Sequence, residues 1–230
     1  MNILDLYKVI NAILDENIPT EKLEDFLDSE RLRIHENVIV KIKGEYDPNV
    51  EHPYSLFSSK DNINLALDCS GPNCTVEKAD IDPTLLASQR IKLATEGYNF
   101  AGIYHSHPPR WKSDHNYTLP TNFKMCPSVP SAVDVIACFS PLIPNFDLML
   151  IGHKPKNSPF IMRAFTPVFF NREYFIHPSS YHIKGRHHGT SNQTSRLEKF
   201  LEKRMAIVCP PESLVRCGFI EINYDVVSGT

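Results

Sequence analysis

The chain has 230 residues, enough for one sizeable domain with extensions or for two small domains. An apolar fraction of 42% supports a packed core, and a formal net charge of −3 argues against a protein that binds nucleic acid through charge. The 18 prolines, about 8% of the chain against a usual ~5%, predict many loops and short elements.

The sequence predicts no membrane span. Its longest apolar run without charged residues, residues 135–146, is too short and contains two prolines. The N-terminus lacks a basic region and Asp5 interrupts its apolar stretch, so we expect no signal peptide and a cytoplasmic or nuclear protein rather than a secreted one. In those compartments the six cysteines are expected to be free thiols.

In the first part of the chain, residues 1–30 have the apolar spacing of two helices, the second capped by Thr20, and predict a helical N-terminal extension. Residues 31–43 alternate charged and β-branched side chains, so propensity favours a strand. Two further strands joined by a turn, and then a helix that ends at a glycine cap, are predicted at residues 55–58, 63–68 and 83–97.

In the second part, residues 98–104 are aromatic and β-branched and predict a strand, which the two prolines at 108 and 109 would end. Helix and strand patterns following one another predict a mixed α/β sandwich. The remaining elements are a helix start at 131–139, a hairpin of strands at 147–152 and 160–165, a further strand at 169–174, a mobile polar loop at 181–195, a helix at 196–205 and a last strand at 219–227.

Two histidines, His105 and His107, follow the 98–104 strand directly. Side chains two residues apart on a strand point to the same face, so both imidazoles can reach one ion. A catalytic zinc site also needs a further ligand and a nearby carboxylate base. The best further ligand is Asp134, in the first turn of a helix that opens at Ser131, where the helix N-terminus favours a carboxylate. Ser131 and Asp134 also fit an ordinary helix cap.

The run His105-Ser106-His107-Pro108, followed by Ser131-x-x-Asp134, resembles the JAMM (Mov34/MPN/PAD-1) family of zinc metallopeptidases, many of which remove ubiquitin or its relatives. The similarity covers residues 31–165. It implies an α+β fold, an MPN/JAMM-like α/β sandwich with a mixed, mostly antiparallel sheet. It also implies a helix over residues 36–45, and there we follow the resemblance rather than propensity.

The resemblance further implies one Zn²⁺ per chain, held by His105, His107 and Asp134, with Ser131 stabilising the tetrahedral intermediate. The family has an upstream glutamate as general base. Glu51 is the candidate and Glu45 the alternative, although Tyr54 and Ser58 stand where the family usually has glycines. The implied activity is a deubiquitinase-like isopeptidase acting on ubiquitin or a ubiquitin-like modifier. A partner subunit is compatible with it, and contacts with nucleic acid or membrane are not expected.

Between His107 and Ser131 lie 23 residues, where the family has a short turn. We therefore predict an insertion at 109–130 within a catalytic domain of residues 31–175, followed by a C-terminal extension, residues 176–230, that packs on the core. The insertion offers Asp114 or His115 as a different third ligand. Its aromatic residues would either grip a substrate tail or pack as a lid; they are Trp111, Tyr117 and Phe123.

Two other functions are compatible with the sequence. The lost glycines and the insertion also fit a weak or inactive MPN-fold scaffold, a binding subunit of a larger complex. A peptidase acting on other peptides is a third reading. The late histidines are better explained as solvated surface than as a second metal site; they are His177, His182, His187 and His188.

Overall fold

The structure is a computed structural model that describes residues 20–76, 78–109, 130, 134, 147–169, 205–208 and 217–228. Outside them lie the predictions for residues 1–19, 110–129, 170–204 and 209–216, and for residues 131–146 apart from Asp134.

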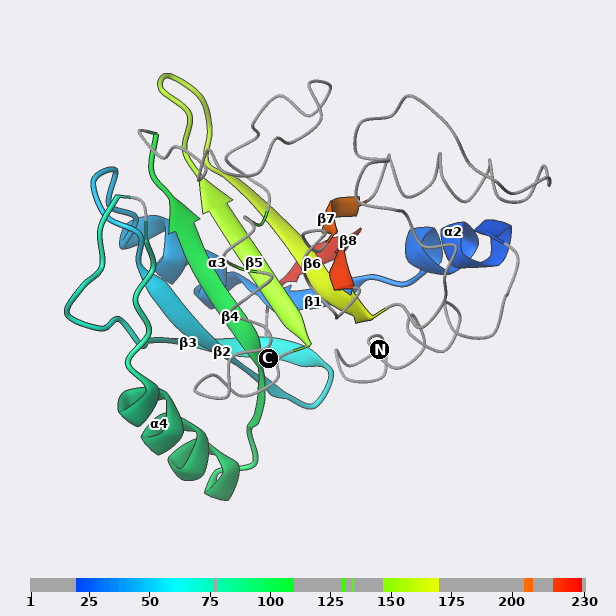
Figure 1. The fold of residues 1–230 in the computed structure, drawn as a ribbon. Helices are drawn as coiled ribbons and strands as arrows, with labels where there is room; N and C mark the ends of the chain where they lie inside the picture. Colours follow the sequence, from blue (N-terminus) through cyan, green and yellow to red (C-terminus); the bar gives the residue numbers. More distant parts are fainter. Residues whose placement is uncertain are drawn as a thin grey trace.

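The described residues form three helices and nine strands (Figure 1). The helices are α2 (Thr20–Ser29), α3 (Glu36–Gly44) and α4 (Pro83–Thr95). The strands are β1 (Leu32–His35), β2 (Pro53–Ser59), β3 (Asn62–Asp68), β4 (Asn99–His107), β5 (Leu148–His153), β6 (Ile161–Phe169), β7 (Met205–Val208), β8 (Cys217–Ile222) and β9 (Tyr224–Val227).

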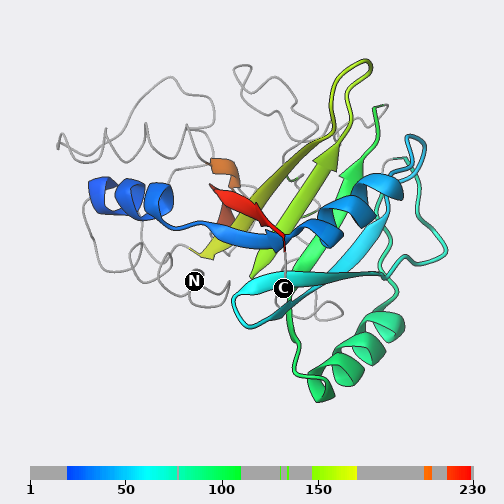
Figure 2. The same ribbon diagram turned by 180° about the vertical axis from the view of Figure 1, so that it is seen from behind.

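These strands form one mixed sheet in the order β7-β8-β6-β5-β4-β2-β3-β1-β9. Five of the eight pairings are antiparallel, while β4 with β5 and β1 with β3 and β9 are parallel. A mixed sheet with few helices is compatible with the expected α+β sandwich. Only Asn223 separates β8 from β9, yet these strands stand near opposite ends of the order. The sheet therefore curls until its two ends approach one another (Figure 2).

The strand predicted at residues 219–227 is thus two strands. At the break, the carbonyl oxygen of Asn223 accepts a hydrogen bond from the Leu32 N–H at 3.0 Å, which ties the break to the start of β1. Pairing between strands almost two hundred residues apart leaves no local signal in the sequence.

Residues 36–44 form helix α3, and only residues 32–35 of the strand favoured by propensity are strand. The Nδ1 atom of His35 caps the helix by accepting a backbone N–H two residues on, at 3.1 Å. Val38, Ile39 and Ile42 are buried, whereas Val40 is 68% exposed. That spacing is one face of a helix, while a strand would have buried Val38, Val40 and Ile42 together. The helix implied by the family resemblance is confirmed here, and the propensity-based strand is wrong.

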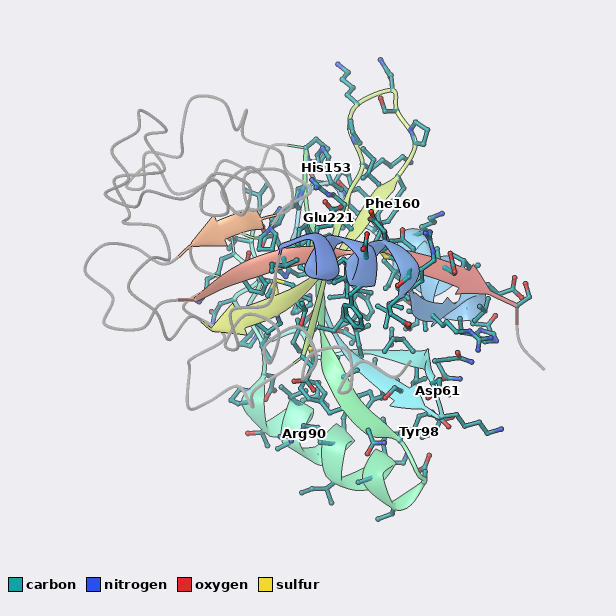
Figure 3. The ribbon with its side chains drawn as sticks, turned by 90° about the vertical axis from the view of Figure 1, so that its right-hand side faces the viewer. Asp61, Arg90, Tyr98, His153, Phe160 and Glu221 are labelled. Carbon is teal, nitrogen blue, oxygen red and sulfur yellow. The ribbon has the colours of Figure 1, made fainter. Side chains whose placement is uncertain are left out.

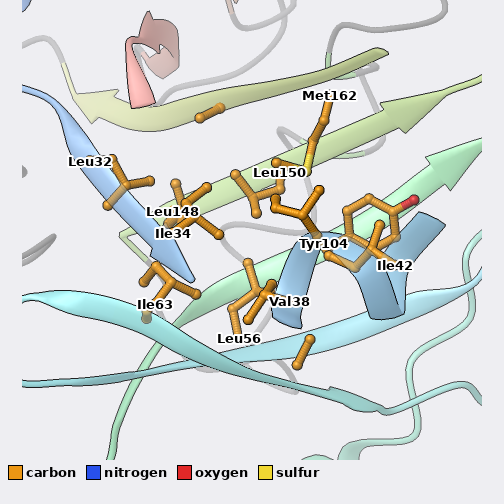
Figure 4. Close-up of a cluster of buried hydrophobic side chains, with 14 of the residues drawn as sticks. Leu32, Ile34, Val38, Ile42, Leu56, Ile63, Tyr104, Leu148, Leu150 and Met162 are labelled. Carbon is orange, nitrogen blue, oxygen red and sulfur yellow. The ribbon is translucent and has the colours of Figure 1, made fainter. Parts of the chain in front are cut away.

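One face of the sheet packs against α3 around an apolar core (Figure 4). Tyr54 of β2 and Tyr104 of β4 lie on this face, with ring centroids 5.7 Å apart. The opposite face is buried as well, by Phe57, Ile103 and Ile151 among others. The central strands are therefore covered on both sides, as near-continuous apolar strands require.

The predicted hairpins are confirmed as β2 with β3 and β5 with β6.

Helix α4 is confirmed as well, and its ends follow ordinary capping rules. The Asp82 side chain accepts the N–H groups that open the helix, and Pro83 occupies its first turn. At the other end Gly97 has φ +85, and the Tyr98 N–H donates to the Leu93 carbonyl at 3.0 Å.

Helix α2 lies where the second N-terminal helix was predicted, and its Leu27 belongs to the apolar core. The first helix falls among residues 1–19, so the extension as a whole stays a prediction. Among the helices of the described residues, none has the length and apolar character needed to cross a bilayer.

Candidate metal centre

Strand β4 brings the two histidines to one face of the sheet. His105 stands opposite Pro53 of β2 and Ile151 of β5, and His107 stands opposite His153 of β5. Both imidazoles are buried, His105 at 3% exposure and His107 at 1%. Pro108 follows His107 directly and has no N–H to donate to a neighbouring strand, so β4 ends at His107.

Asp134 comes to the same point from a part of the chain far along the sequence. The Nε2 atoms of His105 and His107 lie 3.0 Å apart, and Asp134 Oδ1 lies 3.3 Å from His105 Nε2. One ligand atom from each of the three residues lies within 4.8 Å of the other two. Zinc bonds to nitrogen and oxygen are about 2.0–2.2 Å long, so ligands of a tetrahedral site lie roughly 3.3–3.6 Å apart. Two imidazoles and one carboxylate at this spacing can bind a metal ion.

The carboxyl group of Glu51 belongs to the same buried region. Glu51 is 3% exposed, and its Oε1 has no hydrogen-bond partner within the described part of the chain. Burial raises the pKa of Glu51 to about 8, opposed by the charge of His105 and reinforced by Asp134, with a smaller opposing effect of the Ala79 N–H. A buried acid with one carboxylate oxygen left without a partner, beside two potential ligands, is expected where a positive charge or a substrate is to be bound.

The electrostatics of His105 follow from the same neighbours. Burial lowers the pKa of the imidazole, but the Asp134 carboxylate beside it, helped by Glu51, more than offsets this and leaves the pKa above its ordinary value. The group of side chains therefore favours positive charge, whether that is a proton or a metal ion.

The carbonyl oxygen of His107 accepts hydrogen bonds from two residues that the sequence analysis did not identify, His153 and Tyr46. His153, at the end of β5 beside the loop that leads to Phe160 (Figure 3), has its Nδ1 atom 2.8 Å from this oxygen. Because a carbonyl only accepts, that Nδ1 carries the proton. The Tyr46 hydroxyl donates to the same oxygen at 3.4 Å. Only the register of β4 against β5 connects His153 with the site, and nothing in the sequence singles out Tyr46.

The other predicted site residues are distributed as follows. Ser131, Asp114 and His115 lie outside the described residues, as do the insertion's three aromatic residues and the four late histidines. Glu45 is at the end of α3, 46% exposed, where it pairs with Lys41 and accepts the Tyr54 hydroxyl at 2.6 Å. It therefore lies on the α3 face of the sheet, away from the histidine face.

The chain matches no protein-family model and no curated protein. Among solved structures, a protein of Desulfitobacterium hafniense aligns at 17% identity and a TM-score of 0.44, over 58% of this chain and 82% of its own. A JAB1/MPN domain protein of Archaeoglobus fulgidus aligns at 15% identity and a TM-score of 0.32, over 60% and 89% respectively. A protein of Salinibacter ruber aligns at 16% identity and a TM-score of 0.31, over 62% of this chain and 78% of its own.

Proposed function

We propose that this chain is a zinc-dependent peptidase that hydrolyses an isopeptide or peptide bond to ubiquitin or a ubiquitin-like modifier. The observation that carries the proposal is the convergence of His105, His107 and Asp134 beside the buried carboxyl of Glu51, whose Oε1 has no hydrogen-bond partner in the described residues. The JAMM-like order of these residues along the sequence supports the choice of reaction and substrate.

The three ligands would hold the ion with two neutral imidazoles and one carboxylate, a donor set that suits zinc. When bound, zinc supplies Lewis acidity and lowers the pKa of a coordinated water. Glu51 would accept a proton from the attacking water and pass it to the leaving amine. Ser131 is the expected donor to the oxyanion on the scissile carbonyl. No covalent intermediate is needed, so no cysteine has to act as a nucleophile.

The scaffold reading is supported by a specific feature of β2. Tyr54 and Ser58 occupy positions where the resembled family has glycines, and both are buried. In that reading the fold and even the metal ion would be retained for binding a partner, and no bond would be cut.

The test is a cleavage assay with zinc-loaded full-length protein on a panel of di-ubiquitins and ubiquitin-like precursors. Cleavage is expected in the wild type and in Glu45→Gln, and a loss of at least about 100-fold in Glu51→Gln with zinc still bound. A zinc-loaded wild type that cleaves none of the panel would contradict the proposal in favour of the scaffold. Cleavage of unrelated peptides alone would favour a different peptidase.

A further inference from the structure

Ser106 stands between the two histidines and faces the other way. Alternation along β4 places its side chain on the face opposite to His105 and His107, where it is 1% exposed. Its Oγ accepts a hydrogen bond from the His52 N–H at 3.2 Å and donates to the Val50 carbonyl at 3.5 Å. One hydroxyl therefore contacts the backbone on both sides of Glu51.

The position of this segment explains why it needs such a contact. The pairing of β2 with β4 begins at Pro53, opposite His105. Continued by two residues, the same register would set Glu51 opposite His107, on the face of the histidines. The ladder does not continue, because Pro53 has no N–H to donate and the segment before it leaves the sheet. The Ser106 hydroxyl then supplies the hydrogen bonds that a ladder would have given to residues 50–52.

Residues 75 and 79 also form hydrogen bonds with Glu51. The Glu51 N–H donates to the Thr75 carbonyl at 2.8 Å, and the Ala79 N–H lowers the pKa of the Glu51 carboxyl. The hydrogen bonds of the Ser106 side chain thus join the strand of the ligands to the backbone on either side of Glu51.

We propose that Ser106 is a positioning residue for Glu51. Its hydroxyl fixes the backbone of residues 50–52 against β4, so that the Glu51 carboxyl is held beside His105 and Asp134. The residue acts through Glu51 and touches no substrate. The consequence for catalysis rests on the proposed function, but the consequence for the order of the segment does not.

A matched control is available in the same sheet. Ser55 of β2 is fully buried, and its Oγ donates to Oε1 of Gln89 at 2.6 Å. Its replacement by alanine removes a buried hydroxyl of the same kind without touching residues 50–52. Loss of such a buried hydrogen bond destabilises the fold to a similar degree in either position, so stability alone does not separate the two variants.

The experiment compares Ser106→Ala, Ser106→Cys, Ser106→Thr and Ser55→Ala in the full chain. Three readouts are taken: amide hydrogen exchange of His52 in the zinc-free protein, zinc affinity, and kcat and KM on the best di-ubiquitin. For Ser106→Ala we expect His52 exchange at least about tenfold faster, and kcat roughly 10–100-fold lower with KM and zinc affinity nearly unchanged. Cysteine, a weak donor that fills the volume, should give a smaller loss, and threonine should restore both properties. Ser55→Ala should leave kcat and His52 exchange as in the wild type.

Wild-type exchange of His52 in both the alanine and the cysteine variants would overturn the proposal, even if alanine proved too unstable to assay for activity. Zinc affinity that falls as much as kcat would also overturn it, because Ser106 would then serve the histidines rather than Glu51. A wild type that cleaves no substrate would contradict the proposed function. The positioning role of Ser106 would still be tested by the hydrogen exchange of His52, which does not depend on activity.

Discussion

The Nε2 atoms of His105 and His107 face one another at 3.0 Å in the interior of the protein. Two lone pairs at this distance repel, so without a metal ion one imidazole must donate a proton to the other. Asp134 raises the pKa of His105 and stabilises that proton. A metal ion bound by both nitrogens has to displace it.

Zinc affinity should therefore depend on pH. Because Asp134 and Glu51 raise the pKa of His105 despite its burial, the zinc-free site keeps its proton to a higher pH than a free imidazole would, and zinc competes with that proton. We expect the affinity to rise between pH 6 and pH 8, by up to about tenfold per pH unit for one displaced proton. Competition with a chelating dye at three pH values measures this. An affinity that does not change with pH, after correction for the dye, would contradict the arrangement.

Replacing Glu51 by glutamine should stabilise the zinc-free protein at high pH. The pKa of Glu51 is raised to about 8, so the folded protein holds this proton more tightly than the unfolded chain does. Stability from this group is present below the ordinary pKa and is lost as the pH rises towards 8. Each unit of pKa difference is worth about 1.4 kcal/mol, so Glu51→Gln should gain a few kcal/mol at pH 9 and little at pH 4.

Urea unfolding of zinc-free protein at both pH values checks this expectation. The control is Glu96→Gln at an exposed position, which should behave as the wild type at either pH. If Glu51→Gln instead lowered stability at pH 9, the carboxylate would be stabilised by its surroundings, and the raised pKa of Glu51 would be wrong.

His153→Ala should weaken zinc binding without removing a ligand. Its Nδ1–H donates to the carbonyl of His107 and fixes the end of β4. Loss of such a support typically reduces metal affinity by about 10–100-fold. His35→Ala is the matched control, because it removes a capping histidine at α3 and should cost about 1 kcal/mol of stability with zinc affinity unchanged. Equal zinc affinity in the two variants would show that the hydrogen bond from His153 does not stabilise the metal site.

Gly102→Ala should destabilise the protein strongly. A Cβ at this position would lie 1.8 Å from the Leu148 carbonyl oxygen, between the paired strands β4 and β5. The strands would have to separate at the base of the histidine strand, at a cost of about 3 kcal/mol or more. Gly44→Ala meets nothing within 4 Å and should change stability by less than about 1 kcal/mol. Urea midpoints of both variants measure the difference, and similar midpoints would refute it.

Local patterns predicted some parts of this fold well and others poorly. Helix α4 has a proline start and a glycine stop, and β4 has aromatic and β-branched residues ended by prolines, so both were readable. Helix α3 was obscured because Val38, Val40 and Ile42 alternate like a strand. Reading Val38, Ile39 and Ile42 as one helical face would have found it.

The metal-binding residues of the site were predictable from the sequence, whereas the residues that position them were not. His105, His107 and Asp134 were chosen by residue type and order, and the structure brings them together. The burial of Glu51 depends on contacts with residues 75 and 79, which no local pattern reveals. The bonds made by Ser106 depend on where β2 leaves the sheet, and His153 comes near the site only through the register of β4 against β5. Such relationships are properties of the assembled sheet.

Zinc stoichiometry tests the central claim most directly. Purified protein equilibrated with zinc, then dialysed and analysed for metal, should hold one zinc ion per chain. His107→Ala and Asp134→Ala, checked to be folded, should hold almost none, while His35→Ala should hold as much as the wild type. A folded wild type that retains no zinc, or variants that retain as much as the wild type, would contradict a metal centre built from His105, His107 and Asp134.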